Sequence, residues 1–327
     1  MTRELYAPAI RQVAYREVKE TPLAAGQIRV RAEYGAFKHG TELTLWRNSR
    51  GDPNWSPIEL GNMLVGRVTE VGAGVTGFAV DDRACAYSSM CESVVWNAAE
   101  AWKLPEGMDW KAAVCLDPAD FALAGVRDGH VRVGDDVAVF GLGAIGLFVV
   151  QLSKLGGARR IAAVDPIARR REIAKNFGAD LVVDPTAGDP GGKIKKYFSS
   201  RGADVSIDIS GNYSALHQAI RSVAFGGNVV AVAWPSECKG GLDLGAEAHG
   251  NRPTLIFARA CSDPNRDHPR WSEGRIFETL KGWFENGTLK AGGVVDPVVP
   301  FEQAGEAWLR VDRDAASSVK LGVSFQG

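Results

Sequence analysis

Hydrophobic and polar residues alternate along much of the first 118 positions, as they do in strands that bury one face. Glycine-rich turns, such as residues 72–74, separate these stretches. The pattern predicts a mostly antiparallel β region with long loops. Strands are expected at residues 28–32, 65–72 and 80–87.

From about residue 119 the pattern changes to short apolar runs separated by segments of helical spacing. Buried strands that alternate with helices are typical of a doubly wound parallel sheet. Strands are expected at residues 137–140, 160–164, 181–183, 205–209, 228–232 and 255–258, and helices at 145–155, 168–177, 192–199 and 214–225. Strand-like segments return at 294–300 and 319–325, so the C-terminus is expected to rejoin the first region.

The composition is that of an ordinary globular protein with two domains, since 327 residues exceed the usual size of one domain. Lys and Arg number 38 against 39 Asp and Glu, which gives a net charge of −1. This balance removes any global argument for binding nucleic acid or an anionic membrane. We therefore expect a small-molecule substrate as the partner.

The cysteine pattern and the apolar segments bear on the compartment. Five cysteines are an odd number, and none forms a Cys-x-x-Cys pair, which fits reduced thiols better than a disulfide framework. The first residues lack the apolar core of a signal peptide. The longest apolar run, 137–152, is too short and too rich in glycine to span a bilayer. These features predict a cytoplasmic protein.

A Gly-x-Gly-x-x-Gly motif, GLGAIG at 141–146, follows the apolar run 137–140 and opens a helical segment. Asp165 ends the next predicted strand, 19 residues after Gly146. In this setting the glycines allow a tight turn, close approach of a pyrophosphate and close helix–strand packing. The motif therefore predicts a dinucleotide site. Its expected contacts are Gly141, Gly143, Ala144, Ile145, Gly146, Asp165, Arg170 and Ser210.

The choice between NAD and NADP depends on Asp165. A carboxylate there can accept hydrogen bonds from the adenosine ribose, and it would repel a 2′-phosphate by about 4 kcal/mol at ~4 Å. The arginines at 169–171 oppose this, because a guanidinium cluster suits a 2′-phosphate. We expect Arg170 near the adenine ribose, and NAD as the cofactor.

With this motif placed after an N-terminal β region, the chain resembles the medium-chain dehydrogenase/reductase superfamily, which includes alcohol and polyol dehydrogenases. The resemblance rests on residues 61–72 (GNMLVGRVTEVG), 77–83 (GFAVDDR), 133–146 and 175–180 (KNFGAD). It implies a GroES-like catalytic domain at 1–119, an NAD-binding Rossmann domain at 120–290, and a C-terminal return to the catalytic domain at 291–327. It also implies a homodimer or homotetramer formed through the last Rossmann strand.

The superfamily's zinc ligands are where this chain departs from the resemblance. Its first metal motif reads His39-Gly40-Thr41-Glu42 here, its second reads Gly61-Asn62-Met63, and Asp117 stands at the third position. Catalytic zinc usually takes three His, Cys or carboxylate ligands, and Asn62 and Met63 are poor ones. The chain thus looks like the zinc-lacking branch, with no metal expected. Glu42 could still complete a His–Asp–Glu set.

The resemblance also supplies candidate active-site residues. Thr41 matches the superfamily's relay hydroxyl, and His39 or Lys38 could act as the proton acceptor if burial tunes the pKa. His39 could equally be an ordinary core or surface residue. The catalytic set expected from the resemblance is Lys38, His39, Thr41 and Asp117, and the substrate set is Glu42, Trp46, Asn62 and Tyr87. Trp46 could instead pack under a loop.

These features favour an NAD-dependent, zinc-independent oxidoreductase that interconverts a secondary alcohol and a ketone on a sugar, cyclitol or other polyol. One alternative is an NADPH-dependent enone or quinone reductase of the same superfamily, which Asp165 disfavours. The other is a nucleotide-binding protein without catalysis.

Overall fold

The computed structural model describes residues 1–235, 237–238, 240–262 and 264–326. The chain divides into two compact units, one formed by Met1–Cys115 with Ala291–Gly327 and the other by Leu116–Lys290. The first boundary thus lies at Cys115, a few residues before the position expected from the sequence. No helix among the described residues is both long enough and apolar enough to cross a membrane.

The first unit is mostly β, and its described strands form two sheets. One sheet has the order β2–β1–β4, and the other the order β15–β16–β3–β5–β6–β8, with β7 also paired to β3. The strands are β1 (Thr2–Ala7), β2 (Ala14–Val18), β3 (Gln27–Ala36), β4 (Ile58–Glu59), β5 (Met63–Val71), β6 (Arg83–Tyr87), β7 (Ser93–Asn97), β8 (Trp102–Lys103), β15 (Val295–Pro300) and β16 (Lys320–Ser324).

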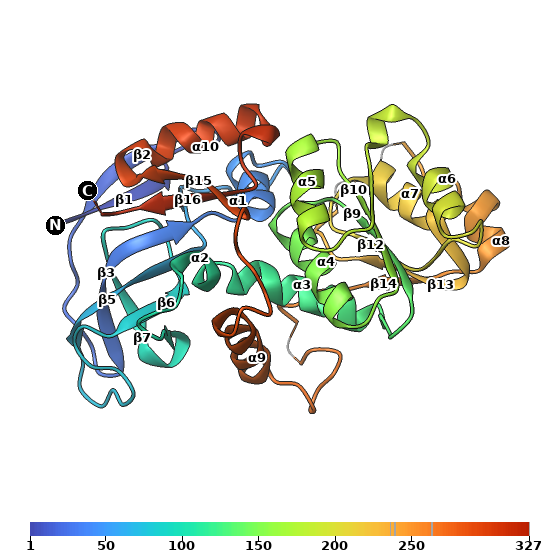
Figure 1. Cartoon of the computed structure of the whole chain (residues 1–327). Coiled ribbons are helices and arrows are strands. Elements are labelled where there is room, and N and C mark those ends of the chain that lie inside the picture. Colours follow the sequence, from blue (N-terminus) through green and yellow to red (C-terminus); the bar gives the residue numbers. More distant parts are fainter. Residues whose placement is uncertain (236, 239, 263, 327) are drawn as a thin grey trace. The chain divides into compact units, whose positions relative to one another are not determined.

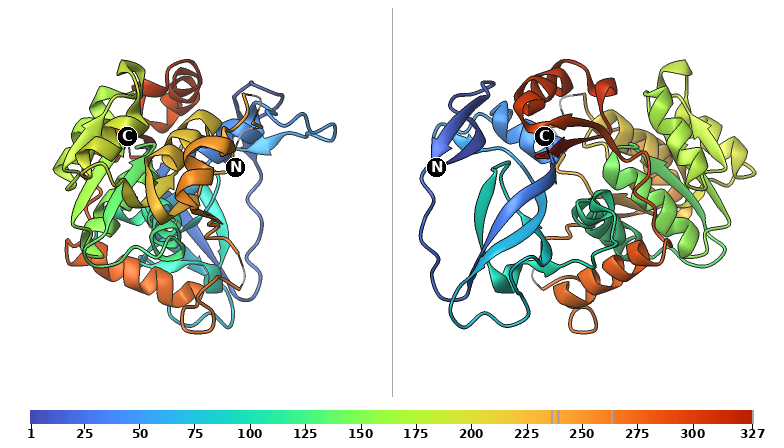
Figure 2. Two further views of the ribbon diagram at one scale, coloured as in Figure 1. Left: turned by 90° about the vertical axis from the view of Figure 1, so that its right-hand side faces the viewer. Right: turned by 60° about the vertical axis from the view of Figure 1, so that its left-hand side comes forward.

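Three α-helices of this unit lie within the described residues: α1 (His39–Trp46), α2 (Trp110–Ala113) and α10 (Ala304–Arg313). Short 3₁₀ turns occupy Ala98–Glu100, Phe301–Gln303 and Ala315–Ser317. The C-terminal strand β16 pairs antiparallel with β3, and the red and blue ribbons run side by side in Figures 1 and 2. Phe37, Trp46 and Trp308 are fully buried in the core beneath this pairing.

The second unit is a doubly wound parallel sheet, as the sequence predicted. Its described strands have the order β11–β10–β9–β12–β13–β14. They are β9 (Asp136–Phe140), β10 (Arg160–Val164), β11 (Leu181–Val183), β12 (Ala203–Asp208), β13 (Val223–Ala231) and β14 (Thr254–Phe257). Val137–Phe140 is buried throughout because helices cover both faces of the sheet. The order reverses between β9 and β12, and ligands of such sheets bind at this point.

The helices of this unit are α3 (Leu116–Asp128), α4 (Ala144–Leu155), α5 (Ala168–Asn176), α6 (Pro190–Tyr197), α7 (Tyr213–Ser222), α8 (His249–Asn251) and α9 (Glu273–Glu285). A 3₁₀ turn at Pro185–Ala187 and a π-helical turn at Leu244–Ala248 complete the list. Helices α4 and α5 cover one face of the sheet, and α6 and α7 cover the other (Figure 1).

Two expected boundaries are wrong. The strand expected at 80–87 begins at Arg83, because Asp81 has a positive φ of 75° in a turn before it. The helix expected to reach residue 225 ends at Ser222, and β13 starts at Val223 rather than near 228. The apolar residues at 223–225 fit either element, so their pattern alone did not separate the two.

Candidate functional site

The glycine motif forms the turn between β9 and α4 that the sequence predicted. Gly141 has a φ of 90°, a conformation that L side chains rarely adopt. A Cβ on Gly146 would lie 1.8 Å from the Gly141 carbonyl oxygen, so only glycine allows the helix to start this close to the turn. A Cβ on Gly143, in contrast, would meet nothing within 4 Å, which leaves the backbone open to a ligand.

The start of α4 suits an anion. Gly143 is the N-cap residue and offers no side-chain cap, so the first helical N–H groups receive no side-chain acceptor from it. Such a helix end attracts the negative charge of a phosphate through its N–H groups and its dipole. Ala144 and Ile145 are the first residues of this helix. The turn and the helix start therefore fit a pyrophosphate.

Asp165 follows β10 and is buried, with an exposed fraction of 3%. Its two oxygens accept hydrogen bonds at 2.8 Å from the backbone N–H groups of Leu142 and Ile167. The carboxylate therefore fixes the glycine turn in addition to lying where a ribose contact was expected. Arg170 lies 3.9 Å from the Asp165 carboxylate, and burial lowers the pKa of its guanidinium. Arg171 donates to the Asp165 carbonyl and also pairs with Asp184.

Ser210 lies on the far side of the same turn. A Cβ on Gly141 would lie 2.9 Å from the Ser210 backbone nitrogen, so the two segments are packed together. The Ser210 N–H and hydroxyl both donate to the carboxylate of Asp208, at 3.0 and 2.6 Å. The Ser210 Oγ in turn accepts the N–H of Asn212. Asp208 thus orders the loop that borders the glycine turn.

Asp208 is a residue that the sequence reasoning missed. It ends β12 beside Phe140 and is buried, and this burial raises the pKa of its carboxyl to about 6 although the hydrogen bonds from Ser210 oppose the rise. A signal was present in the sequence, because an acidic residue stands near the end of the fourth predicted strand of the parallel sheet, 205–209. Ligands bind outside the carboxyl ends of such strands.

In the first unit, the polar candidates gather where α1 begins and β5 starts. Glu42 is buried, and one oxygen accepts the N–H of Lys38 while the other accepts the N–H of Gly61 at 2.6 Å. The next residue, Asn62, donates its N–H to the Ala36 carbonyl and accepts the N–H of Ser88. Met63 pairs with Tyr87 between β5 and β6. The residues 36–42, 60–63 and 87–90 therefore meet in this unit.

His39 supplies a hydrogen-bond acceptor at the end of the β3–β16 pairing. In a hydrogen-bonded antiparallel pair the two residues exchange both backbone bonds. Phe37 donates to the Leu321 carbonyl, but the Leu321 N–H goes to Nε2 of His39 at 3.0 Å, and the Phe37 carbonyl accepts from the Lys320 ammonium at 2.9 Å. His39 therefore acts as an acceptor at Nε2 in this structure, which leaves that nitrogen engaged.

The remaining candidates fall into different surroundings. Trp46 is fully buried, packs on Trp308 and donates its Nε1 to the Gln12 carbonyl, so it does not offer a face to a substrate as was expected. Tyr87 is exposed and makes an edge contact with Trp102. Thr41 is half-buried on α1. Asp117 is buried in the first turn of α3, in the second unit.

The donor set for a metal is incomplete. Among the described residues no three His, Cys, Asp or Glu side chains lie together as a metal site. Each Glu42 oxygen accepts one backbone N–H group in this conformation, and Nε2 of His39 accepts the Leu321 N–H. A zinc ion bound at Nε2 of His39 would have to displace this hydrogen bond.

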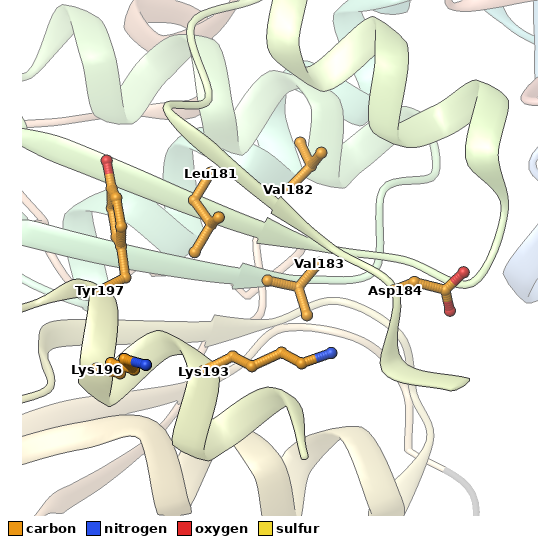
Figure 3. Close-up of a pocket in the computed structure, with 7 residues that line it drawn as sticks. All are labelled: Leu181, Val182, Val183, Asp184, Lys193, Lys196 and Tyr197. Atoms are coloured by element: carbon orange, nitrogen blue, oxygen red, sulfur yellow. The ribbon is translucent and has the colours of Figure 1, made fainter. Parts of the chain in front are cut away.

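A pocket of about 540 Å³ lies elsewhere in the second unit (Figure 3). It lies between the edge strand β11 and helix α6 and contains none of the residues predicted for the site. Its lining consists of Leu181, Val182, Val183, Asp184, Lys193, Lys196 and Tyr197.

Comparisons with known proteins agree with this geometry. The profile of the family described as "Zinc-binding dehydrogenase" matches residues 144–257. The D-guloside 3-dehydrogenase of Escherichia coli K12 is 41% identical, and the alignment covers 99% of this chain and 100% of that protein. The chain belongs to the medium-chain dehydrogenase/reductase superfamily.

Solved structures show the same fold. A protein of Sinorhizobium meliloti 1021 solved with NADP has a TM-score of 0.84 at 20% identity, with 99% of each chain covered. An alcohol dehydrogenase of E. coli CFT073 solved with NADH has a TM-score of 0.81 at 20% identity, again with 99% of each chain covered. This member of the superfamily is accordingly a dehydrogenase.

The raised pKa of Asp208 makes a prediction about stability. Its folded pKa of about 6 lies above the ordinary value of 3.8, so ionisation costs the folded state free energy as pH rises from about 4 through 6. Asp208→Asn keeps an acceptor oxygen for Ser210 and stays neutral. It should raise the free energy of unfolding by about 3 kcal/mol at pH 8 and leave it unchanged at pH 4.

Urea unfolding of both proteins at pH 4 and pH 8 measures this difference. Asp81→Asn, at an exposed turn of the first unit, serves as the control and should change little at either pH. A variant less stable than the wild type at pH 8 would contradict the account of Asp208.

Proposed function

We propose that this protein is an NAD-dependent dehydrogenase that oxidises a secondary hydroxyl of a sugar, glycoside or other polyol to a ketone, without a catalytic metal. The observation that carries the proposal is the 41% identity, over nearly the whole of both chains, to a D-guloside 3-dehydrogenase. The glycine turn and the polar cluster around Glu42 supply the groups that such an activity needs.

The cofactor would be held by the β9–α4 turn. Gly141, Gly143 and the first N–H groups of α4 suit its pyrophosphate, and Asp165 suits the adenosine ribose. A bound nicotinamide supplies a hydride acceptor. The protein's own task is then to orient the alcohol, to keep competing water away and to accept the hydroxyl proton.

Lys38 is the proposed proton acceptor, and Thr41 the relay hydroxyl. Because Nε2 of His39 accepts the Leu321 N–H, we assign His39 to positioning: it holds the start of α1 against β16. Asp117, at the start of α3, is also proposed to take part in catalysis. Glu42 is assigned to fixing the Lys38 and Gly61 segments rather than to direct contact with substrate.

A homodimer or homotetramer is part of the proposal. Strand β14 is the last strand of its sheet, and Leu255 and Phe257 on it are exposed. An exposed strand edge with apolar side chains is a ready surface for pairing with a second copy.

Preference for NAD is the first outcome expected of this proposal. The Asp165 carboxylate would repel a 2′-phosphate, so kcat/KM with NAD should exceed that with NADP by roughly tenfold or more. Asp165→Asn removes the charge but keeps an acceptor for the Leu142 N–H. It should lower the ratio of kcat/KM with NAD to kcat/KM with NADP. Steady-state kinetics with both cofactors measure it.

Asp81→Asn is the control, because Asp81 lies in an exposed turn of the first unit and pairs only with Arg67 among its described ionic partners. It should leave the cofactor ratio unchanged. Equal use of the two cofactors by the wild type would show that the arginines at 169–171 outweigh Asp165.

Catalysis without a metal is the second expected outcome. The purified protein should contain far less than one zinc per subunit, and exhaustive chelation should leave its turnover unchanged. Metal analysis and activity before and after chelation test this. One zinc per subunit, with activity lost on chelation and restored by Zn²⁺, would refute the metal-free part of the proposal and leave the dehydrogenase assignment intact.

A loss of turnover on substitution of Lys38 is the third expected outcome. Lys38→Ala should lower kcat by roughly a hundredfold or more, as expected for a lost general base, while cofactor affinity stays the same. His39→Asn should lower stability more than kcat, since it weakens the contact with Leu321. The two variants are compared by kcat across pH, by cofactor titration and by thermal unfolding. Full turnover of Lys38→Ala at every pH would show that the assignment is wrong.

A further inference from the structure

The pocket between β11 and α6 has an apolar lining. Strand β11 stands at the end of its sheet, so no other strand among the described residues covers its outer edge. Leu181 and Val183 point from this strand towards α6, whereas Val182 points to the opposite side (Figure 3). The ring of Tyr197, on α6, lines the same pocket. These side chains offer a surface on which a flat apolar ring can pack.

The α6 side of the pocket carries positive charge. Lys193 and Lys196 line the pocket, are exposed and lie about one turn apart on this helix. The Lys193 ammonium donates to the Ala187 carbonyl at 2.8 Å, which leaves two of its three donors for a ligand. Lys196 forms no hydrogen bond or ion pair with any residue that the structure describes. Both ammonium groups can therefore bind an anion.

The two acidic residues that flank β11 are already engaged. Asp184 lines the pocket, but its carboxylate pairs with Arg171 at 3.0 Å and accepts hydrogen bonds from the N–H and hydroxyl groups of Thr186. Asp180, which precedes the strand, accepts the Ile161 N–H at 2.7 Å. The charge of the two lysines is therefore left for a ligand.

The size and lining of the pocket fit a small molecule. Its volume of about 540 Å³ falls within the range of small-molecule sites, which combine a mostly apolar lining with a few polar or charged groups. An inorganic anion would leave the apolar lining in contact with water. A neutral hydrocarbon would leave the ammonium groups unused. A molecule that uses both sides needs an apolar body and one anionic group.

We propose that this pocket is a second ligand site, which binds a small organic anion with a flat apolar ring, namely an aromatic carboxylate. The ring packs on Leu181, Val183 and Tyr197, and the carboxylate pairs with the ammonium groups of Lys193 and Lys196. None of these residues belongs to the cofactor or substrate positions expected from the sequence. The inference therefore goes beyond the proposed function and does not depend on it.

Calorimetric titration of 2-naphthoate into the full chain, at low ionic strength, tests this site. The double variant Lys193→Gln/Lys196→Gln should bind 2-naphthoate roughly threefold to thirtyfold more weakly than the wild type, because two exposed ion pairs are lost. The neutral analogue 2-naphthamide should bind the wild type more weakly than 2-naphthoate does. It should bind the double variant as well as it binds the wild type.

The matched control is Lys19→Gln/Lys195→Gln, which removes the same two positive charges. Lys195 lies on α6 but does not line the pocket, and Lys19 belongs to the first unit. This control should keep the wild-type affinity, and thermal unfolding should show equal midpoints for all three proteins. Equal weakening in both double variants would show a nonspecific effect of net charge and would overturn the inference, as would the absence of saturable binding to the wild type.

Two competitors separate this site from other ways of binding the probe. Saturating NAD should leave the affinity for 2-naphthoate unchanged, because the pocket shares no residue with the predicted cofactor site. Loss of binding in the presence of NAD would place the probe in the cofactor site and would overturn the inference. Displacement of the probe by an equal concentration of inorganic phosphate would show that the apolar lining is not used, with the same consequence.

Discussion

The first unit's candidate site depends on one buried carboxylate. Glu42 joins two segments that are far apart in sequence, because it accepts both the Lys38 and the Gly61 N–H groups. Hydrogen bonds to an ionised acceptor are worth about twice as much as neutral ones, and two of them on one carboxylate also fix direction. The start of α1 and the residues before β5 are thereby held in one arrangement. Lys38, His39 and Asn62 owe their relative positions to it.

Buried carboxylates also hold the backbone in place in the second unit. Asp165 accepts the Leu142 and Ile167 N–H groups and so ties the glycine turn to the end of β10, while Asp208 orders the Ser210 loop on the other side of that turn. In each case a buried acid accepts hydrogen bonds from backbone N–H groups. An acidic residue near a site can therefore hold the backbone in place, a role that its position in the sequence does not reveal.

The fold was largely predictable, because the spacing of hydrophobic residues and the positions of the glycines determine most of it. The runs at 137–140 and 160–164 are typical of buried strands, and Gly146 can only be glycine because a Cβ there would meet the Gly141 carbonyl oxygen. The site was less predictable. Trp46 lies four residues beyond Glu42 on α1 and looks like a cleft residue in sequence, but α10 covers it with Trp308 from 262 residues later. The hydrogen bond between His39 and Leu321 likewise depends on the register in which β16 pairs with β3, which the sequence pattern does not specify.

The proposed absence of a catalytic metal bears on which substrates the site can orient. A zinc ion would bind an alcohol oxygen tightly enough to orient almost any alcohol, and it would also lower the pKa of the hydroxyl. Under the proposed metal-free chemistry, orientation has to come from hydrogen bonds that are each worth only about 1 kcal/mol net. Several such bonds are needed to hold one reactive geometry, and a simple alcohol has too few hydroxyl groups to make them. The proposed metal-free site is therefore suited to substrates rich in hydroxyl groups.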